Sequence, residues 1–333
     1  MKGRIMIYRV GMIGWEDHIG YTLEAIAGMK NVRLAAIARV GERSADRVKS
    51  FTAFTAETKV YDDYREMLEK EALDIAAVYT PHGTRAQAII DAARAGCHIY
   101  SEKPLAANLE DLERIKKAVA EANTTLTMML VMRFYGVYRK VREIVHSGAI
   151  GAVAQCSAQK SYKVGDRPEW MKKRGSFAGT IPYIACHSLD LIRWCSGLEF
   201  VKGAAFHHNV GKPELKEMEN TASMILLANN GATISTRLDY CRPENADAWG
   251  DDRLRIAGVD GIVELIGDQV FLMTKNEKKH IVPAPPNGAQ FPNLIAAIEG
   301  REELVVPAED CYRITEVVLK LRDAADRQVM TDL

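Results

Sequence analysis

The sequence predicts an α/β domain with a parallel sheet, followed by an α+β domain with a large, mostly antiparallel open sheet. Short apolar strands alternate with amphipathic helices early in the chain, longer strands in succession dominate later, and a long helical pattern closes it. Alternation of strand and helix is typical of doubly wound sheets, whereas successive strands are typical of antiparallel ones. We therefore expect domains over residues 1–123 and 124–333.

The first domain is expected to alternate buried strands with helices. A helix with Ala88, Ile89 and Ala92 on one face leads to the strand before Lys103. The other strands are expected at residues 9–13, 32–38 and 75–79, with a further one at 125–130 just beyond the boundary. Further helices are expected at residues 43–51, 63–70 and 108–122, and around Leu23 and Ile26.

The second domain is expected to be antiparallel, because turn signals such as Asn229-Asn230-Gly231 separate its apolar runs. Strands are expected at residues 153–162, 204–209, 221–228, 232–240, 254–257, 261–265 and 270–272. Helices are expected at residues 135–147, 186–195, 293–299 and 308–327. A large sheet with one uncovered face commonly binds another copy, so we expect a homo-oligomer, either a dimer or a tetramer.

Composition is that of an ordinary globular protein, with 47% hydrophobic and 26% charged residues among 333. Lys+Arg and Asp+Glu both number 44, so neither a nucleic-acid partner nor an anionic membrane partner is expected. The sequence has no apolar run of membrane-spanning length and does not begin with a signal peptide, which predicts a cytoplasmic protein. Six scattered cysteines without a C-x-x-C pair predict reduced thiols and no metal site.

One run in the first domain points to chemistry, because Glu102, Lys103 and Pro104 follow a buried strand. Open α/β sheets bind ligands at the carboxyl ends of their strands, so the lysine is placed to meet one. A desolvated lysine can donate or accept a proton near neutral pH. Taken alone, the tripeptide fits a surface lysine capping a loop better than it fits a catalytic one.

The turn after the first strand resembles a dinucleotide-binding turn only in part. Gly14 fits the first glycine of that pattern, but Glu16 holds the second position and Ile19 the third. A glutamate brings a side chain and a negative charge toward the place where a pyrophosphate would approach. The turn therefore fits a structural loop as well as it fits a phosphate site.

The end of the second strand bears on the choice of cofactor. An acidic residue there would bind the ribose hydroxyls of NAD, whereas an arginine suits the extra phosphate of NADP. This chain has Ala38 and Arg39 at that point, which favours NADP(H) over NAD(H). A solvated surface arginine is the alternative interpretation.

Four ordered blocks resemble the Gfo/Idh/MocA oxidoreductases, named after glucose–fructose oxidoreductase and inositol dehydrogenase. The blocks are residues 76–82, 96–105, 147–151 and 179–194, the second of which contains the Glu-Lys-Pro signature. The resemblance covers nearly the whole chain. It implies a Rossmann-type N-terminal domain and a substrate-binding C-terminal domain.

The resemblance also implies catalytic residues. The family lysine corresponds to Lys103 and the family histidine to His187, but Tyr183 stands where the family has an aspartate. Tyr183 could relay a proton beside the lysine, or bind a sugar ring and leave His187 as the base, or mark a site that has lost hydride chemistry. Asp190, on the same helical face as His187, could orient the histidine ring or bond to backbone amides.

Further residues are implied as contacts of the cofactor and the substrate. For the cofactor they are Gly14, Trp15, Ile19, Ala38, Arg39, Thr80, Pro81, His82, Glu102 and Lys103. For the substrate they are Arg133, Trp170, Tyr183 and His187, with a solvated loop as the alternative for Trp170.

The function implied is hydride transfer between a nicotinamide and a carbinol of a sugar, polyol or related hydroxy compound. One alternative is a redox-neutral lyase or glycosidase-like enzyme that uses bound NAD(P) transiently. Another is a non-catalytic sugar-binding or sensor protein, which the incomplete glycine turn and Tyr183 would suit.

Overall fold

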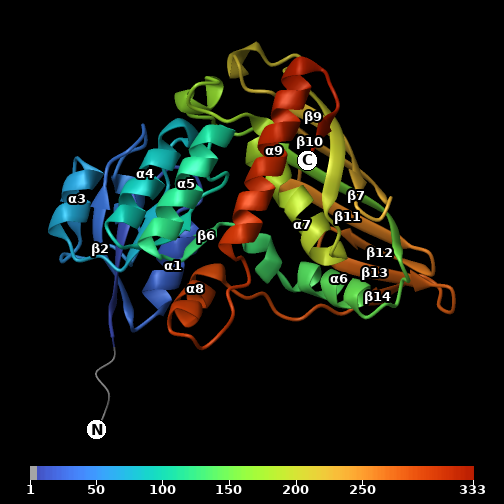
Figure 1. Cartoon of the computed structure of the whole chain (residues 1–333), viewed down its shortest axis with the longest axis horizontal. Helices are drawn as coiled ribbons and strands as arrows, with labels where there is room; N and C mark the ends of the chain where they lie inside the picture. The colour runs from blue at the N-terminus through green and yellow to red at the C-terminus, as the bar shows by residue number, and fades with distance from the viewer. Residues whose placement is uncertain (1–5) are drawn as a thin grey trace, which may run out of the picture. The chain divides into compact units, whose positions relative to one another are not determined.

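The computed structural model describes residues 6–333, and their contacts form two compact units (Figure 1). Unit 1 comprises residues 6–129, 175–177 and 289–312, and unit 2 comprises residues 130–174, 178–288 and 313–333. These ranges differ from the expected boundary at Asn123. The reason is that the strand at Leu126–Met128 pairs with the parallel sheet, and Thr127 Oγ1 donates to the Val306 carbonyl at 2.8 Å.

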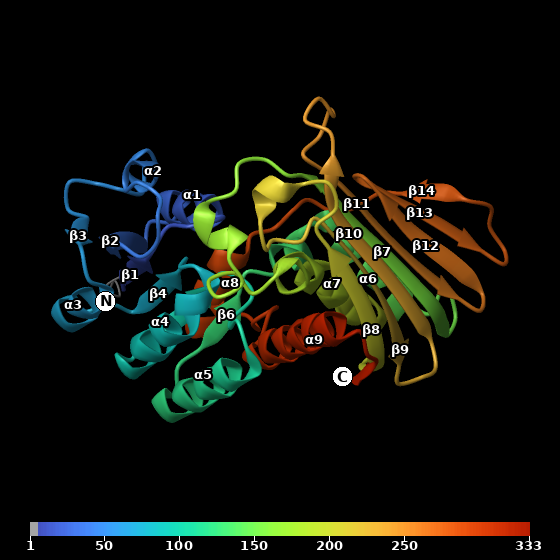
Figure 2. The same cartoon turned by 90° about the horizontal axis from the view of Figure 1, so that it is seen from above.

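Unit 1 is built on a six-stranded parallel sheet in the order β3-β2-β1-β4-β5-β6, which confirms the predicted α/β fold. Helices α4 and α5 lie on one face of this sheet, and α1 and α8 lie on the other (Figure 2). The strands are β1 Tyr8–Ile13, β2 Val32–Ala38, β3 Lys59–Tyr61, β4 Ile75–Val78, β5 His98–Ser101 and β6 Leu126–Met128. The helices are α1 Gly20–Gly28, α2 Asp46–Lys49, α3 Tyr64–Lys70, α4 His82–Arg94, α5 Leu109–Ala122 and α8 Gln290–Ile298.

Unit 2 is built on a nine-stranded sheet in the order β14-β13-β12-β11-β7-β10-β9-β8-β15, antiparallel except for the β7–β10 pair. Its strands are β7 Val153–Lys163, β8 Phe200–His208, β9 Thr221–Ala228, β10 Thr233–Arg242, β11 Gly250–Gly258, β12 Gly261–Ile266, β13 Gln269–Thr274, β14 His280–Val282 and β15 Thr331–Asp332. Its α-helices are α6 Gly136–His146 and α7 Cys186–Ser196, and α9 Ala308–Arg327 continues into it from unit 1. Shorter helical segments are η1 Val131–Phe134, η2 Glu169–Lys172, η3 Ile181–Ala185 and η4 Pro213–Leu215.

One face of the nine-stranded sheet carries α6 and α7, and within the described residues no helix covers the other (Figure 2). Strand β9 shows the reason in its sequence, since Ala222, Met224 and Leu226 are buried while the residues between them are exposed. Period-2 alternation of this kind gives a sheet one apolar and one solvated face.

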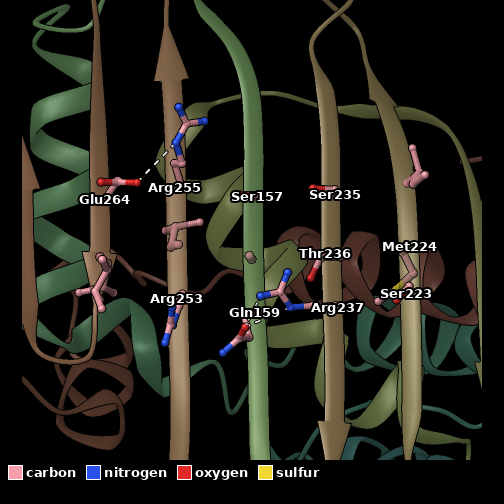
Figure 3. A pocket seen from close by; sticks show the side chains of 15 residues that line it. Ser157, Gln159, Ser223, Met224, Ser235, Thr236, Arg237, Arg253, Arg255 and Glu264 are labelled. Atoms are coloured by element: carbon pink, nitrogen blue, oxygen red, sulfur yellow. Dashed lines mark hydrogen bonds and ion pairs between the residues drawn. The ribbon is translucent and has the colours of Figure 1, made fainter. Parts of the chain in front are cut away.

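We call the solvated side of this sheet the open face, and Figure 3 shows its central part. A hollow of about 370 Å³ lies there between β9, β10, β7, β11 and β12. Ile225 is 68% exposed on this face, and Arg255 pairs with Glu264 at 3.5 Å. The open face thus combines exposed apolar side chains with charges of both signs.

Candidate functional site

The carboxyl ends of β1, β4 and β5 bring several predicted cofactor residues together in unit 1. The three strands are neighbours in the sheet, so the segments that follow them, which begin at Gly14, Tyr79 and Glu102, meet at one edge. The Glu16 N–H donates to the Tyr79 carbonyl at 2.9 Å, and the Glu102 N–H donates to the Val78 carbonyl at 2.9 Å. Thr80, Pro81 and Lys103 follow directly in these segments.

The turn after β1 requires a glycine at its first position. Gly14 has φ +71°, and a Cβ there would lie 2.8 Å from the Tyr79 carbonyl oxygen and 2.9 Å from that of Val40. Helix α1 then begins without a side-chain cap and without an acidic residue in its first turn. A helix N-terminus that carries no acidic side chain suits a pyrophosphate, so this part of the chain fits a dinucleotide.

The Glu16 carboxylate does not point toward the place where a pyrophosphate would bind. It is turned into the loop after β2, where Oε1 accepts hydrogen bonds from the N–H groups of Glu42 and Arg43, both at 3.0 Å. The side chain is only 1% exposed. The expected conflict with a phosphate is therefore avoided, because the charge is bound inside the protein.

Of the other predicted cofactor residues near this turn, three have buried side chains and one has an exposed side chain. Trp15 is 2% exposed and donates through Nε1 to the Arg43 carbonyl at 2.7 Å, and Ile19 and Ala38 are fully buried. Only the backbone of these three residues could face a ligand. Arg39, directly after β2, has an exposed side chain.

Lys103 and Glu102 form the charged centre of unit 1. Both side chains are buried, and the Lys103 Nζ lies 4.0 Å from Oε2 of Glu102. The same Oε2 accepts from the Lys103 N–H at 2.8 Å, and Oε1 lies 2.7 Å from Nδ1 of His18. Burial raises the pKa of Glu102, but the charges of Lys103, His18 and Arg85 outweigh burial and hold the pKa well below its usual range.

Arg85 of α4 is a residue of this centre that sequence reasoning missed. It is fully buried and donates to the carbonyls of Lys103 at 2.7 Å, Pro104 at 2.9 Å and Thr80 at 2.5 Å. It therefore joins the ends of β4 and β5. The available signal was an arginine on the apolar face of a helix, three residues before Ala88.

His82 begins α4 and is buried against the Phe177 ring, with 5.1 Å between the ring centroids. Burial, together with the positive charges of Arg85 and Lys103, lowers the pKa of His82 well below its usual range. The imidazole is therefore neutral at physiological pH. It can offer a hydrogen bond without adding charge beside Lys103.

In unit 2, Tyr183 and His187 lie on consecutive helical segments. Tyr183 lies in η3, a π-helical turn, and His187 is the second residue of α7. Both side chains are mostly buried, at 3% and 9% exposure. Single π-helical turns are frequent at functional sites, because the extra residue shifts which side chains face a cavity.

A buried carboxylate fixes the start of this helical stretch. Oε2 of Glu219 accepts from the Thr180 N–H at 3.0 Å, and the Glu219 carbonyl accepts from Thr180 Oγ1 at 2.6 Å. Glu219 Oε1 also binds the Arg174 guanidinium. These bonds hold the residue that precedes η3, and through it they set the position of Tyr183.

Arg133 and Asp190 form a buried ion pair within unit 2. The Nε of Arg133 donates to Oδ2 of Asp190 at 3.0 Å, and Nη2 donates to Oδ1 at 2.5 Å. Both oxygens of Asp190 accept from Arg133, which is a contact that the sequence did not predict for this carboxylate. The predicted substrate residue Arg133 thus has a structural partner that the sequence did not indicate.

Trp170 lies in η2, within the long polar segment that follows β7, and is 3% exposed. Its ring is therefore buried rather than held in solvent. Each residue predicted for the cofactor therefore lies in unit 1, and each one predicted for the substrate alone lies in unit 2.

Two family models match this chain. Residues 8–130 match the Gfo/Idh/MocA model described as "Oxidoreductase family, NAD-binding Rossmann fold", and residues 138–264 match the one described as "GFO/IDH/MocA C-terminal domain". The two matches follow the division between the parallel and the antiparallel sheet.

Curated relatives are similar at about a quarter of aligned positions. The dTDP-3,4-didehydro-2,6-dideoxy-alpha-D-glucose 3-reductase of Streptomyces violaceoruber is 25% identical over 96% of this chain and 85% of its own. Inositol 2-dehydrogenase 3 of Saccharopolyspora erythraea is 25% identical over 80% of this chain and 73% of its own. The Bacillus subtilis oxidoreductase YrbE is 27% identical over 63% of this chain and 60% of its own.

A solved structure from Thermotoga maritima, described as an oxidoreductase, resembles the whole chain. It is 32% identical, with a TM-score of 0.92, over 98% of this chain and 100% of that one. Within residues 6–333 of the present chain, no helix is both long and apolar enough to cross a bilayer.

Proposed function

Because this chain belongs to the Gfo/Idh/MocA oxidoreductase family, we propose that it transfers a hydride between a nicotinamide cofactor and a carbinol of a sugar or polyol. The observation that carries the proposal is the buried Glu102–Lys103 centre beside the glycine turn of a six-stranded parallel sheet. When bound, a nicotinamide supplies the hydride acceptor or donor. The side chains of this protein would supply orientation and proton movement.

Lys103 is proposed to hold and polarise the substrate oxygen. Its ammonium is almost fully buried beside one carboxylate, and Arg85 fixes its backbone. A preorganised positive charge out of water stabilises a developing alkoxide more strongly than one in solvent. Glu102 is proposed as a positioning residue, since its oxygens accept from His18 and from the Lys103 N–H.

Tyr183 and His187 are the two candidates for moving the proton of that oxygen. Tyrosine and histidine can both act as general acid or base when they are held near the reacting oxygen. The Glu219–Thr180 bonds fix the segment that carries both residues. The aspartate that the family has at position 183 is absent from this sequence, so one of these two side chains would do its work.

NADP(H) is proposed as the preferred cofactor, within a family described as NAD-binding. Strand β2 ends in Ala38, without a carboxylate for the ribose hydroxyls, and Arg39 follows with an exposed side chain. Among residues 6–333, no carboxylate forms an ion pair with Arg39. A free guanidinium at this point suits a 2′-phosphate.

The substrate class is proposed from the names of two relatives, a nucleotide-sugar reductase and an inositol dehydrogenase. Arg133, Trp170, Tyr183 and His187 remain the residues proposed to border the substrate. Of these, Arg133 would act through its backbone or through Asp190, because its guanidinium is engaged in the buried pair.

A second copy of this chain is proposed to cover the open face of unit 2. Phe206, Ile225 and Ile266 are exposed by 66%, 68% and 40% on strands of this sheet. An apolar area of this kind, flanked by Arg237, Arg255 and Glu264, suits a self-complementary interface. The cytoplasmic location, which is expected from a sequence without a signal peptide or a membrane-spanning apolar run, stays a prediction.

The proposal is tested by titrating the full chain with oxidised and reduced NAD and NADP in a calorimeter. We expect binding of both, with NADP(H) the tighter. The Arg39→Gln variant should lose that preference while its affinity for NAD(H) stays within about threefold. Equal or tighter binding of NAD(H) by the wild type would contradict the role proposed for Arg39.

A further inference from the structure

Glu16 belongs to the turn after β1, but its carboxylate serves the loop after β2. Besides the two hydrogen bonds from the N–H groups of Glu42 and Arg43, its Oε2 lies 3.4 Å from Nε of Arg43. The side chain is 1% exposed. The Glu16 carboxylate thus accepts two backbone hydrogen bonds and neutralises part of the charge of the Arg43 guanidinium.

These three groups together form an anion site. Successive backbone N–H groups in a turn make a concavity that binds anions, and a guanidinium adds charge of the right sign. Gly41 gives the carboxylate its room, since it has φ +115° and a Cβ there would lie 2.5 Å from Oε1 of Glu16. The loop is therefore shaped around a negative group, and the chain supplies that group itself.

This anion site lies directly after β2, in the segment that bears on the choice between NAD and NADP. Residues directly after the second strand of a dinucleotide fold distinguish a ribose 2′-hydroxyl from a 2′-phosphate. Two arginines lie in that segment, the exposed Arg39 and Arg43, whose side chain is 36% exposed. Arg39 forms no ion pair with a carboxylate among the residues from Met6 onward, whereas Arg43 already shares its charge with Glu16.

We propose that Glu16 is a specificity-determining residue that limits the preference for NADP(H) over NAD(H). It does so by occupying the N–H groups of residues 42 and 43 and the charge of Arg43, all of which would otherwise serve a 2′-phosphate. This inference rests on the proposed function only in requiring that the chain bind a nicotinamide dinucleotide. Glu16 acts through Arg43 and the loop, and its own buried carboxylate touches no ligand.

The direct test is the Glu16→Gln variant, titrated calorimetrically with NAD⁺ and NADP⁺ as the full chain. Glutamine keeps an oxygen that can accept from the N–H groups of residues 42 and 43, but it no longer shares the charge of Arg43. The ratio of the NAD⁺ to the NADP⁺ dissociation constant should therefore rise about tenfold, allowing for screening. The gain should come from tighter NADP⁺ binding. An unchanged ratio, or an equal loss of affinity for both cofactors, would overturn the proposal.

Arg43→Gln provides the matched control in both backgrounds. In the wild type it should lower NADP⁺ affinity by less than about threefold, because Glu16 already shares that charge, whereas in the Glu16→Gln background it should remove the gain. If Glu16→Gln does not fold, the single Arg43→Gln variant still tests whether Glu16 withholds the Arg43 charge from a 2′-phosphate. A tenfold loss of NADP⁺ affinity there would show that Arg43 is free for the phosphate and would overturn the inference.

Failure of this inference can be told apart from failure of the proposed function. A wild type that prefers NAD⁺, with a Glu16→Gln variant shifted toward NADP⁺, would refute the role of Arg39 and support that of Glu16. If neither dinucleotide binds, 2′-AMP serves as the probe, since it needs only the loop after β2. The variant should then bind 2′-AMP more tightly than the wild type does, and equal binding would overturn the inference.

Discussion

Glu102 and His18 are 84 residues apart in sequence, and the carboxylate of one binds both the ring and the backbone N–H of the other. Oε1 of Glu102 lies 2.7 Å from Nδ1 and 3.2 Å from the N–H of His18. The segment that carries Lys103 is thereby tied to the turn after β1. A change at Glu102 should therefore be felt at both the proposed catalytic lysine and the proposed phosphate site.

Replacing Glu102 by glutamine should remove a stabilisation that depends on pH. The pKa of the folded carboxyl lies well below its ordinary value of 4.5, so near and below that pH the unfolded chain binds more protons than the folded one. Stability from this group is then fully present above pH 4.5 and is lost as the pH falls through the folded pKa. At neutral pH we expect Glu102→Gln to cost about 3–5 kcal/mol, as for other broken buried pairs.

Urea unfolding of both proteins across acid and neutral pH checks this. The difference in unfolding free energy should be largest above pH 4.5 and shrink below it. The control is Glu121→Gln on α5, whose side chain is 61% exposed and which should cost less than about 1 kcal/mol. A wild-type advantage over Glu102→Gln that did not vary with pH would contradict the account.

Lys103→Met should abolish turnover in a protein that still folds, with a lower stability because Glu102 loses a neighbouring charge. Methionine keeps the length of the side chain but cannot hold or polarise an oxygen, so a loss of kcat of at least about 10³-fold is expected. Lys117→Met is the matched control, because Lys117 lies on α5 of the same unit with 77% of its side chain exposed. Near-normal turnover by Lys103→Met would refute the catalytic assignment.

Breaking the Arg133–Asp190 pair on one side only should destabilise the protein strongly. Both side chains are almost fully buried, so Asp190→Asn or Arg133→Met leaves one charge without its partner, at a cost of about 3–5 kcal/mol. Removing both charges together should cost less than the sum of the two single changes. Denaturant unfolding measures all three variants, and additive costs would show that the pair is not coupled.

Tyr183→Phe and His187→Asn separate the two candidates for proton movement. The substitution that removes the acid/base group should lower kcat about 10²–10⁴-fold and change the pH profile of kcat, with a smaller effect on cofactor affinity. The substitution at the residue that does not move the proton should mainly raise KM. If neither variant lowers kcat by more than about tenfold, neither residue moves the proton.

Ile225→Glu should split the proposed oligomer. Ile225 is 68% exposed on the open face, and a carboxylate there would be desolvated on association. Val259→Glu is the control, since Val259 is 71% exposed between β11 and β12. Sedimentation velocity should show a smaller particle for Ile225→Glu alone. A wild type that sediments as a monomer would refute the interface.

Strong periodicity made most of the fold predictable. The closing helix was expected at residues 308–327 and is observed as Ala308–Arg327, because its apolar positions recur over many turns. Strands β3, β14 and β15 were missed for a physical reason. They are short and have no buried residue, so their sequences show no apolar pattern. They form strands because their backbones pair with a neighbouring strand.

The sequence predicted the site residues that belong to a local motif. It did not predict the contacts between residues that are far apart in the chain. The Glu-Lys-Pro run located Lys103, but nothing local indicates that Arg85 joins its backbone to Thr80. Arg133 and Asp190 lie 57 residues apart, so the sequence alone could not pair them. Glu16 looked unsuited to its turn because the loop that binds its carboxylate lies beyond another strand.

The most direct test of the central claim is a spectrophotometric assay of the full chain with NADP⁺ or NAD⁺ and a panel of polyols and sugars, inositol included. We expect the absorbance of reduced nicotinamide to rise with at least one of them, and the Lys103→Met variant to bind the cofactor without producing that rise. Conversion of a sugar without any net reduction of the nicotinamide would contradict it. So would a wild-type chain that binds neither dinucleotide.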